Sequence, residues 1–356
     1  MKKSLLATTA LAALGAVAVA GSASAAEKIQ VTVGGYMQQW FGFADSSKNV
    51  NRNNTGFDQK TDSEIHFKGV TTLDNGIKVG IHVELEGQTE SGGAADQIDE
   101  QYLFVDGSFG RFLMGSENSA SYLMHYSIPS HGATLDSGDI TDWIAGGDFT
   151  GARTNGRGID NDSEKLTYFT PRFSGFQLGV SYVPAQNQDL DGPQNTNDGV
   201  RDDGFSVAAN FNQSFGDFKL LASAGYQHFG EDDAVAGSDL ESYQFGLRLG
   251  FAGFTLAGTY GEEDRANAAQ VFTDTQETYG LGLSYAAGPM GVSFAYIGSD
   301  RDRATDAHQD AFELGAKYAL GPGVDLKGSV YYLEREAAGV DRAKGFAVVG
   351  GLDLSF

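Results

Sequence analysis

The chain has 356 residues and no cysteine, which excludes a disulfide scaffold, thiolate metal sites and cysteine nucleophiles. Its formal net charge of −23 argues against nucleic acid as a partner, because phosphate binding needs lysine and arginine. Glycine is abundant at 49 residues, and proline is scarce at 6. Beyond the N-terminal segment, no stretch is apolar for long enough to predict a transmembrane helix.

The first residues have the pattern of a secretory signal peptide. Lys2 and Lys3 precede the apolar run LLATTALAALGAVAVA, and ASAAE then offers small residues for cleavage near Ala25 or Ala26. A retained anchor helix is the alternative, but no charged flank follows that would stop transfer. We therefore expect a cleaved signal peptide at 1–26 and a single exported domain at 27–356.

After this segment, alternation with a period of two dominates the sequence. In IKVGIHVEL, for example, the apolar set from Ile77 to Leu85 faces one side, while Lys78, Gly80, His82 and Glu84 face the other. This pattern predicts β-strands with one apolar face and one polar or glycine-rich face. We expect about sixteen strands, each near ten residues long. Their expected positions are 28–44, 61–73, 77–90, 98–106, 110–116, 163–171, 175–184, 204–214, 218–229, 241–250, 253–263, 275–286, 290–299, 310–320, 324–335 and 345–356.

The connectors between these strands alternate in length. Short ones such as FSGF and FAGF are tight-turn signals, and long polar ones such as GEDDAVAGSD separate them. This order predicts a string of hairpins with all tight turns at one end. The connector 117–162 is much longer than the rest. Within it, ENSASYLMHYSI could form a short helix, and Trp143, Ile144, Phe149 and Ile159 predict packing.

The chain also ends on a two-faced strand, KGFAVVGGLDLSF, which would leave an unpaired edge unless another strand covers it. We expect residues 346–356 to pair with the first strand near 29–43. The fold class is therefore all-β, a transmembrane antiparallel β-barrel with apolar side chains toward lipid and polar ones toward a lumen. A soluble sandwich or propeller would explain the strands but not the alternation of connectors.

Several segments together resemble the general diffusion porins of Gram-negative bacteria. They are the first strand VTVGGYMQQWFGF, the hairpin SEIHFKGVTTLDNGIKVGIHVELE, QYLFVDGSFGRFLMGS before the long connector, KLTYFTPRFSGFQLGVSY after it, and the terminal phenylalanine. The resemblance implies sixteen strands, short periplasmic turns, long extracellular loops, and a third long loop, 117–162, folded into the lumen.

The resemblance also implies partners and a location. It implies a homotrimer in the Gram-negative outer membrane, in contact with lipid and lipopolysaccharide, and a role for Phe356 as a signal to the barrel-assembly machinery. The glycines of VTVGGY could let neighbouring subunits approach closely, or they could relieve strand curvature.

Strand parity selects charged residues that should line the lumen wall. They are Glu64, His66, Lys68, Lys78, His82, Glu84, Lys165, Arg248, Glu313, Lys317, Asp325 and Lys327, with Arg111 less firmly placed. These side chains either set the field across a narrow neck or are solvated far from it. The long loop adds Glu117, Asp136, Asp139, Asp142, Asp148, Arg153 and Arg157. In a constriction its acids would concentrate cations, whereas in an extracellular loop they would be ordinary solvated charges.

The sequence predicts no enzyme, because it contains neither an H-E-x-x-H spacing nor a G-x-S-x-G elbow. No cofactor or dedicated metal site is expected. Weak Ca²⁺ binding is plausible in DLDGPQNTNDGVRDDG, through Asp189, Asp191, Asp198, Asp202 and Asp203, although their order departs from a calcium loop.

The expected function is passive diffusion of small hydrophilic solutes and ions, with a moderate preference for cations. A substrate-selective channel for a sugar or a particular ion, and a non-pore structural or adhesin barrel, remain alternatives. Most strand aromatics fall on the lipid face, with Tyr36 and Trp40 as the main inward exceptions, which disfavours a sugar channel.

Overall fold

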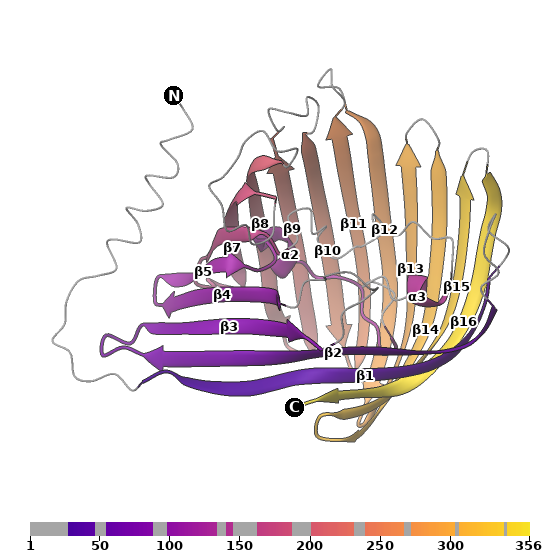
Figure 1. Cartoon of the computed structure of the whole chain (residues 1–356), viewed down its shortest axis with the longest axis horizontal. Coiled ribbons are helices and arrows are strands. Elements are labelled where there is room, and N and C mark those ends of the chain that lie inside the picture. The colour runs from indigo at the N-terminus through magenta and orange to yellow at the C-terminus, as the bar shows by residue number, and fades with distance from the viewer. Residues whose placement is uncertain are drawn as a thin grey trace.

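The computed structural model describes residues 28–46, 55–87, 98–133, 140–144, 162–186, 201–230, 239–266, 272–302, 306–337 and 340–356. These residues form a closed antiparallel barrel of sixteen strands in chain order, confirming the predicted fold class (Figure 1). The strands are β1 (Gln30–Ser46), β2 (Thr55–Thr72), β3 (Lys78–Glu86), β4 (Ile98–Gly107), β5 (Gly110–Ser116), β6 (Glu164–Phe169), β7 (Phe176–Ala185), β8 (Asp202–Phe215), β9 (Phe218–Phe229), β10 (Leu240–Phe251), β11 (Phe254–Ala266), β12 (Phe272–Ala287), β13 (Met290–Asp302), β14 (Ala307–Gly321), β15 (Val324–Ala337) and β16 (Val340–Ser355).

The barrel closes where the last strand pairs with the first, as the sequence predicted. Met37 lies opposite Leu354 and Phe43 opposite Val348 in the β1–β16 register. Beyond this register, Gly35 and Phe356 exchange two backbone hydrogen bonds, of 3.0 and 3.1 Å. Gly35 has φ +148°, and an added Cβ would lie 2.2 Å from the Glu64 carbonyl oxygen. Close contact between β1 and β2 within one chain therefore explains why position 35 is a glycine.

The two faces of the wall follow the predicted parity. On β10, Phe245, Leu247 and Leu249 are about half exposed on the outer face. Gln244, Gly246 and Arg248 alternate with them and face inward, where they meet residues of the long connector. Contact with lipid requires an apolar outer face. The backbone polar groups are satisfied separately, by hydrogen bonds between neighbouring strands.

The tight turns have the backbone geometry that the sequence predicted. Ser174 and Gly175 both have positive φ, 48° and 90°, and so do Ala252 and Gly253, at 49° and 85°. Two successive residues with positive φ match the right-handed twist of the flanking strands, and glycine tolerates this conformation without a steric cost.

At the opposite end of the barrel, several strands extend further than expected. β2 begins at Thr55 rather than at 61, and β16 begins at Val340 rather than at 345. Asp45 pairs with Thr55 in the part that was expected to be loop. In the added part of β2, residues 55–60, polar side chains occupy both faces, so the ladder hydrogen bonds continue without an apolar alternation. The sequence pattern therefore ends before the strand does.

Two short helices, α2 (Ala120–Leu123) and α3 (Ile140–Trp143), lie within the long connector 117–162. α2 falls where a short helix was expected, and α3 was not predicted. No helix in the described ranges is long and apolar enough to cross a membrane. Both helices lie on the inner side of the wall (Figure 1), so the described part of the connector is folded into the barrel, as expected. The predicted signal peptide lies outside the described residues.

Candidate functional site: the channel lumen

We call residues 117–133 and 140–144 the inner loop. A series of inward-facing serines, each on a different strand, accepts hydrogen bonds from its backbone N–H groups. Ser181 Oγ accepts from Ala120 at 2.8 Å, and Ser223 Oγ accepts from Tyr126 at 2.9 Å. Three further pairs continue the series, Ser121 to Ser206 (2.9 Å), His131 to Ser293 (2.8 Å) and Ala133 to Ser329 (2.9 Å). Because the donors are backbone groups, the wall fixes the path of the main chain itself.

Inward glycines make room for this path. A Cβ at Gly246 would lie 2.2 Å from the Tyr126 carbonyl oxygen, and one at Gly315 would lie 2.6 Å from the Gly132 nitrogen. A Cβ at Gly291 would lie 2.8 Å from the His131 ring. Real Cβ atoms do not approach this closely, so these positions require glycine. The polar-or-glycine face read from the sequence is thus partly a groove that receives the inner loop.

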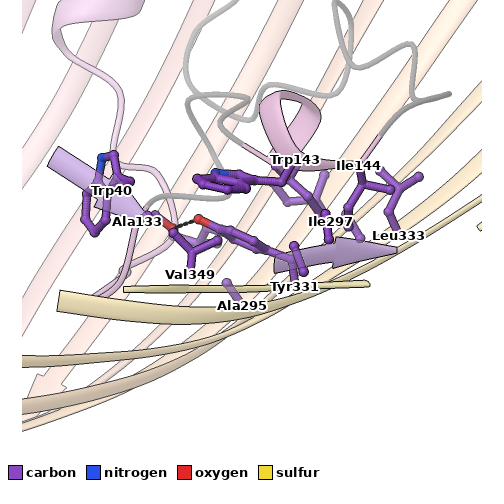
Figure 2. Close-up of a cluster of buried hydrophobic side chains, with 14 of the residues drawn as sticks. Trp40, Ala133, Trp143, Ile144, Ala295, Ile297, Tyr331, Leu333 and Val349 are labelled. Atoms are coloured by element: carbon purple, nitrogen blue, oxygen red, sulfur yellow. Dashed lines mark hydrogen bonds between the residues drawn. The ribbon is translucent and has the colours of Figure 1, made fainter. Parts of the chain in front are cut away.

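The end of the inner loop is held by apolar packing. Trp143 and Ile144 are buried against inward-facing Tyr331, Leu333 and Val349 (Figure 2). We call this group, with Trp40, Ile140 and Ile297, the loop anchor cluster. Tyr331 also donates its hydroxyl hydrogen bond to the Ala133 carbonyl (Figure 2). The sequence analysis named Tyr36 and Trp40 as the main inward aromatics and missed Tyr331, which the inner loop covers.

The register places all thirteen predicted wall residues on the inner face. Glu64, His66 and Lys68 lie on β2, Lys78, His82 and Glu84 on β3, Arg111 on β5, Lys165 on β6, Arg248 on β10, Glu313 and Lys317 on β14, and Asp325 and Lys327 on β15. Parity could assign this face but could not show which of these side chains the inner loop covers.

Three of them hold the inner loop instead of facing open water. Glu313 is fully buried and accepts hydrogen bonds from Ser130 Oγ at 2.9 Å and Ser329 Oγ at 2.6 Å. Lys165 is buried and donates to the carbonyls of Glu117 and Ser163. Arg248 donates to the carbonyl and to Oγ of Ser127.

Other cations of the wall are paired with acids near the short turns. Lys327 lies 2.5 Å from Asp353, and Lys317 lies 3.3 Å from Asp325. Arg111 lies 3.6 Å from Asp106. Above Lys317 and Lys327, burial and then these two positive charges lower the pKa of His131 on the inner loop.

The predicted loop acids divide into two groups. Glu117 is buried, and its carboxylate accepts a hydrogen bond from the Asn118 backbone N–H at 2.7 Å. Asp142 is exposed on α3. Asp136, Asp139, Asp148, Arg153 and Arg157 lie outside the described residues. A role for any of these charges in selectivity stays a prediction.

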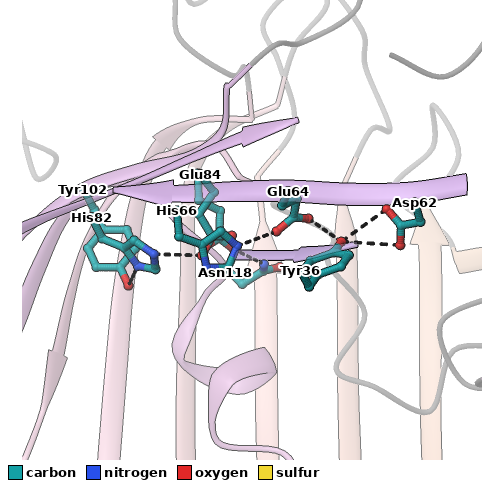
Figure 3. A network of polar contacts seen from close by, with 9 residues as sticks. Tyr36, Asp62, Glu64, His66, His82, Glu84, Tyr102 and Asn118 are labelled. Atoms are coloured by element: carbon teal, nitrogen blue, oxygen red, sulfur yellow. Dashed lines mark hydrogen bonds and ion pairs between the residues drawn. The ribbon is translucent and has the colours of Figure 1, made fainter. Parts of the chain in front are cut away.

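The most acidic part of the described wall spans β2–β4. Glu64 and Glu84 lie beside His66 and His82 (Figure 3). Glu100 accepts a hydrogen bond from the Asn118 side chain at 3.0 Å. The sequence analysis missed Tyr36, whose hydroxyl donates to Glu64 at 2.8 Å, as a member of this network. Strand register would have been needed to find it, because Tyr36 lies opposite Glu64 across the β1–β2 ladder.

Of the weak Ca²⁺ candidates, Asp202 is buried, and Asp203 accepts the Tyr182 hydroxyl hydrogen bond at 2.8 Å. Asp189, Asp191 and Asp198 lie outside the described residues. Nothing in the described part of the chain gathers these acids around a common point.

A closed barrel with an apolar outer face, a polar inner face and an inward loop defines a β-barrel channel. The model of the Gram-negative porin family matches residues 7–338. The chain therefore belongs to the Gram-negative porin family, and it is an outer-membrane channel, as its sequence resemblance indicated.

Individual relatives and solved structures are similar along most of the chain. Outer membrane porin protein 32 of Delftia acidovorans is 26% identical over 349 residues, covering 95% of this chain and 91% of the relative. Major outer membrane protein P.IB of Neisseria meningitidis is 27% identical over 306 residues, covering 82% of each. The solved anion-selective porin from Comamonas acidovorans has a TM-score of 0.62 at 19% identity, covering 92% of this chain and all of that one. The trimer form of OmpT from Vibrio cholerae has a TM-score of 0.62 at 13% identity, covering 93% of this chain and all of that one.

Proposed function

We propose that this porin is a water-filled channel for passive diffusion of small hydrophilic solutes and ions, with a moderate preference for cations. It acts as a channel and not as an enzyme. The observation that carries the preference is the distribution of charge along the described wall. Lys317, Lys327 and Arg111 are paired with acids, while Lys165 and Arg248 are bound to the inner loop. The acids of β2–β4, among them Glu64 and Glu84, gather on one part of the inner face, beside the lysines Lys68 and Lys78.

A surplus of acids along a narrow water path raises the local concentration of cations. One similar solved porin is described as anion-selective. At 19% identity, that likeness concerns the fold, so the sign of the preference depends on this chain's own side chains.

The test is the reversal potential across a tenfold gradient of potassium chloride in a planar bilayer. The dilute side should be about 0.1 M or lower, where the Debye length is about 10 Å and wall charges are least screened. We expect a potential of the cation-selective sign that moves toward zero in the double variant Glu64→Gln/Glu84→Gln. A potential of the anion-selective sign would refute the preference, and the absence of any conductance would refute the channel itself.

We also propose that the protein is a homotrimer in contact with lipid and lipopolysaccharide, and that it is exported by a cleaved signal peptide at 1–26. The trimer form of OmpT, which has the same fold, supports the assembly. Native mass measurement of detergent-extracted protein tests it: three copies are expected, and a stable conducting monomer would contradict it. N-terminal sequencing of that sample should begin near Ala26 or Glu27.

A further inference from the structure

Three side chains on the inner face of the β2–β3 hairpin converge on one point. His66 lies opposite Glu84 in the register, and His82 is two residues before Glu84 on the same face of β3. His82 Nε2 lies 2.9 Å from Glu84 Oε1, and His66 Nδ1 lies 3.6 Å from the same oxygen. One ligand atom from each residue lies within 4.8 Å of the others. Figure 3 shows the three side chains pointing toward one another.

The other ring nitrogen of each histidine is already occupied. His66 Nε2 lies 2.8 Å from Glu64 Oε2, and because a carboxylate only accepts, the Nε2 proton points to Glu64. In the neutral ring, Nδ1 of His66 is then a lone pair directed toward Glu84. His82 Nδ1 lies 2.6 Å from the Tyr102 hydroxyl, which can hold that nitrogen in its protonated form. Histidines that bind metals have this arrangement, in which the second nitrogen donates to a carboxylate or another oxygen.

The environment of His82 Nε2, the ring nitrogen that faces Glu84, independently indicates a cation at this point. His82 is 8% exposed, and within the described part of the chain its Nε2 makes no aligned hydrogen bond, although Glu84 Oε1 is 2.9 Å away. Burying a polar atom without an aligned partner costs free energy. When Nδ1 holds the proton toward Tyr102, the Nε2 lone pair faces a carboxylate oxygen, and a cation between the two atoms removes their repulsion.

The distances suit a small transition-metal ion. Zinc binds imidazole nitrogen and carboxylate oxygen at about 2.0–2.2 Å, so tetrahedral ligand atoms lie about 3.3–3.6 Å apart. The distance between His66 and Glu84 falls in this range, and that between His82 and Glu84 would open by a few tenths of an ångström. Ca²⁺ and Mg²⁺ prefer all-oxygen ligands, whereas imidazole favours zinc, copper and nickel.

The surroundings favour a positive ion that arrives through the lumen. Carboxylate oxygens of Glu64, Glu84 and Asp99 also lie within 4.8 Å of one another, and Lys68 is the cation opposite His82 in the register. His66 and Glu84 are only partly buried, and a recess of about 370 Å³ lies beside His82 and Tyr102. Lumen water can therefore reach the ion and fill its fourth position.

We propose that His66, His82 and Glu84 form a binding site for one divalent transition-metal ion of the zinc class on the wall of the channel. Glu64 and Tyr102 are positioning residues that orient the two imidazoles. The sequence analysis expected no metal site, because its three ligands come from two strands and match no local motif. A bound dication would oppose the field of the acidic wall and weaken its attraction for permeating cations.

The first test is equilibrium dialysis of zinc against the full chain in detergent, stripped with a chelator beforehand. We expect one tight site per chain, lost in the double variant His66→Gln/His82→Gln. Tyr102→Phe should weaken binding roughly 10- to 100-fold, because it removes only the orienting hydroxyl. Retention of a channel current and of the folded electrophoretic form would show that each variant still folds.

Two matched variants control for adventitious histidine binding. His228→Gln removes a histidine with one carboxylate neighbour, Glu241 at 3.4 Å, and should leave zinc binding unchanged. His308→Gln removes a histidine between Asp300 and Asp310 on the outer face, at 2.6 and 3.0 Å. Unchanged binding in the His66/His82 double variant would overturn the proposal, and so would loss of the tight site in His308→Gln alone or the absence of tight binding in the unmodified chain.

The electrical readout separates this proposal from the proposed ion preference. Micromolar zinc should shift the reversal potential of the unmodified channel toward the anion-selective sign and should not shift that of the double variant. Dialysis measures binding without a current, so a failed ion preference leaves the metal test intact. Tight binding with no electrical shift would place the ion away from the conduction path and would contradict the lumen site.

Discussion

Replacing Trp143 by alanine tests whether the loop anchor cluster holds the inner loop to the wall. Trp143 is 6% exposed, and its ring fills the space that a Cβ at Gly42 would enter at 2.5 Å. Truncating a buried tryptophan costs about 3–5 kcal/mol. The serine hydrogen bonds, each contributing about 0.5–1.5 kcal/mol, act on residues 120–133 and do not replace this packing. Since 1.4 kcal/mol is a factor of ten, the undocked population near α3 should rise by more than about 100-fold.

The assay is single-channel recording in planar bilayers. The unmodified channel should give a quiet open level, and Trp143→Ala should give frequent brief transitions, because the loop end then moves within the water path. Leu247→Ala is the control, since it removes an apolar side chain from the lipid-facing wall and should leave the current trace unchanged. If the noise of Trp143→Ala equals that of the unmodified channel, packing at α3 does not hold the loop, and the reasoning fails.

Three further predictions follow from the same contacts. Gly246→Ala should raise current noise, because its Cβ would lie 2.2 Å from the Tyr126 carbonyl oxygen. In the control Gly250→Ala, the nearest atom would lie 3.4 Å from the new Cβ, and the current trace should not change. Equal traces in the two variants would contradict the idea that inward glycines make room for the inner loop. The pKa of His131 is lowered, so the docked inner loop favours the neutral ring. Docking is therefore complete above the ordinary histidine pKa of about 6.5 and weakens as the pH falls below it. Current noise should rise below that pH in the unmodified channel but not in His131→Gln. Deleting Phe356 removes two backbone hydrogen bonds to Gly35 and an exposed ring, so outer-membrane yield in cells should fall more than the heat resistance of the purified barrel, and an unchanged yield would refute an assembly role.

The barrel was predictable because lipid imposes a simple pattern on sequence. Each membrane-spanning strand must alternate, each short turn needs glycine, and the ends must meet. Residues such as Leu247 and Arg248 were therefore assigned to the correct faces without any knowledge of distance. The long strand ends were not predictable in this way, because segments such as residues 55–60 are polar on both faces and show no apolar alternation.

The path of the inner loop was harder to predict from the sequence. Parity placed Glu313 and Arg248 in the lumen but could not show that Ser130 and Ser127 bind them. One signal was available, since FAVVGG on β16 has apolar side chains on both faces, and a strand that is apolar on both faces is buried on both. Val349 faces inward as part of the loop anchor cluster, while Val348 is half exposed on the outer face.

The inner loop covers part of the barrel wall, so the side chains that contact solutes must come from the remaining part. Main-chain pairing and the lipid-facing side chains stabilise the closed barrel, so the residues of the inner face are not required for closure. Along β7–β10 and β13–β16, serine and glycine on that face serve the inner loop. On β2–β4, the described loop contacts Glu100 through Asn118, packs against Tyr102 and Phe104 through the cluster of Ala120 and Met124, and reaches Lys60 through Trp143. Glu64, Glu84 and their histidines carry both proposals made for this wall, so ion preference and metal binding should both respond to changes there.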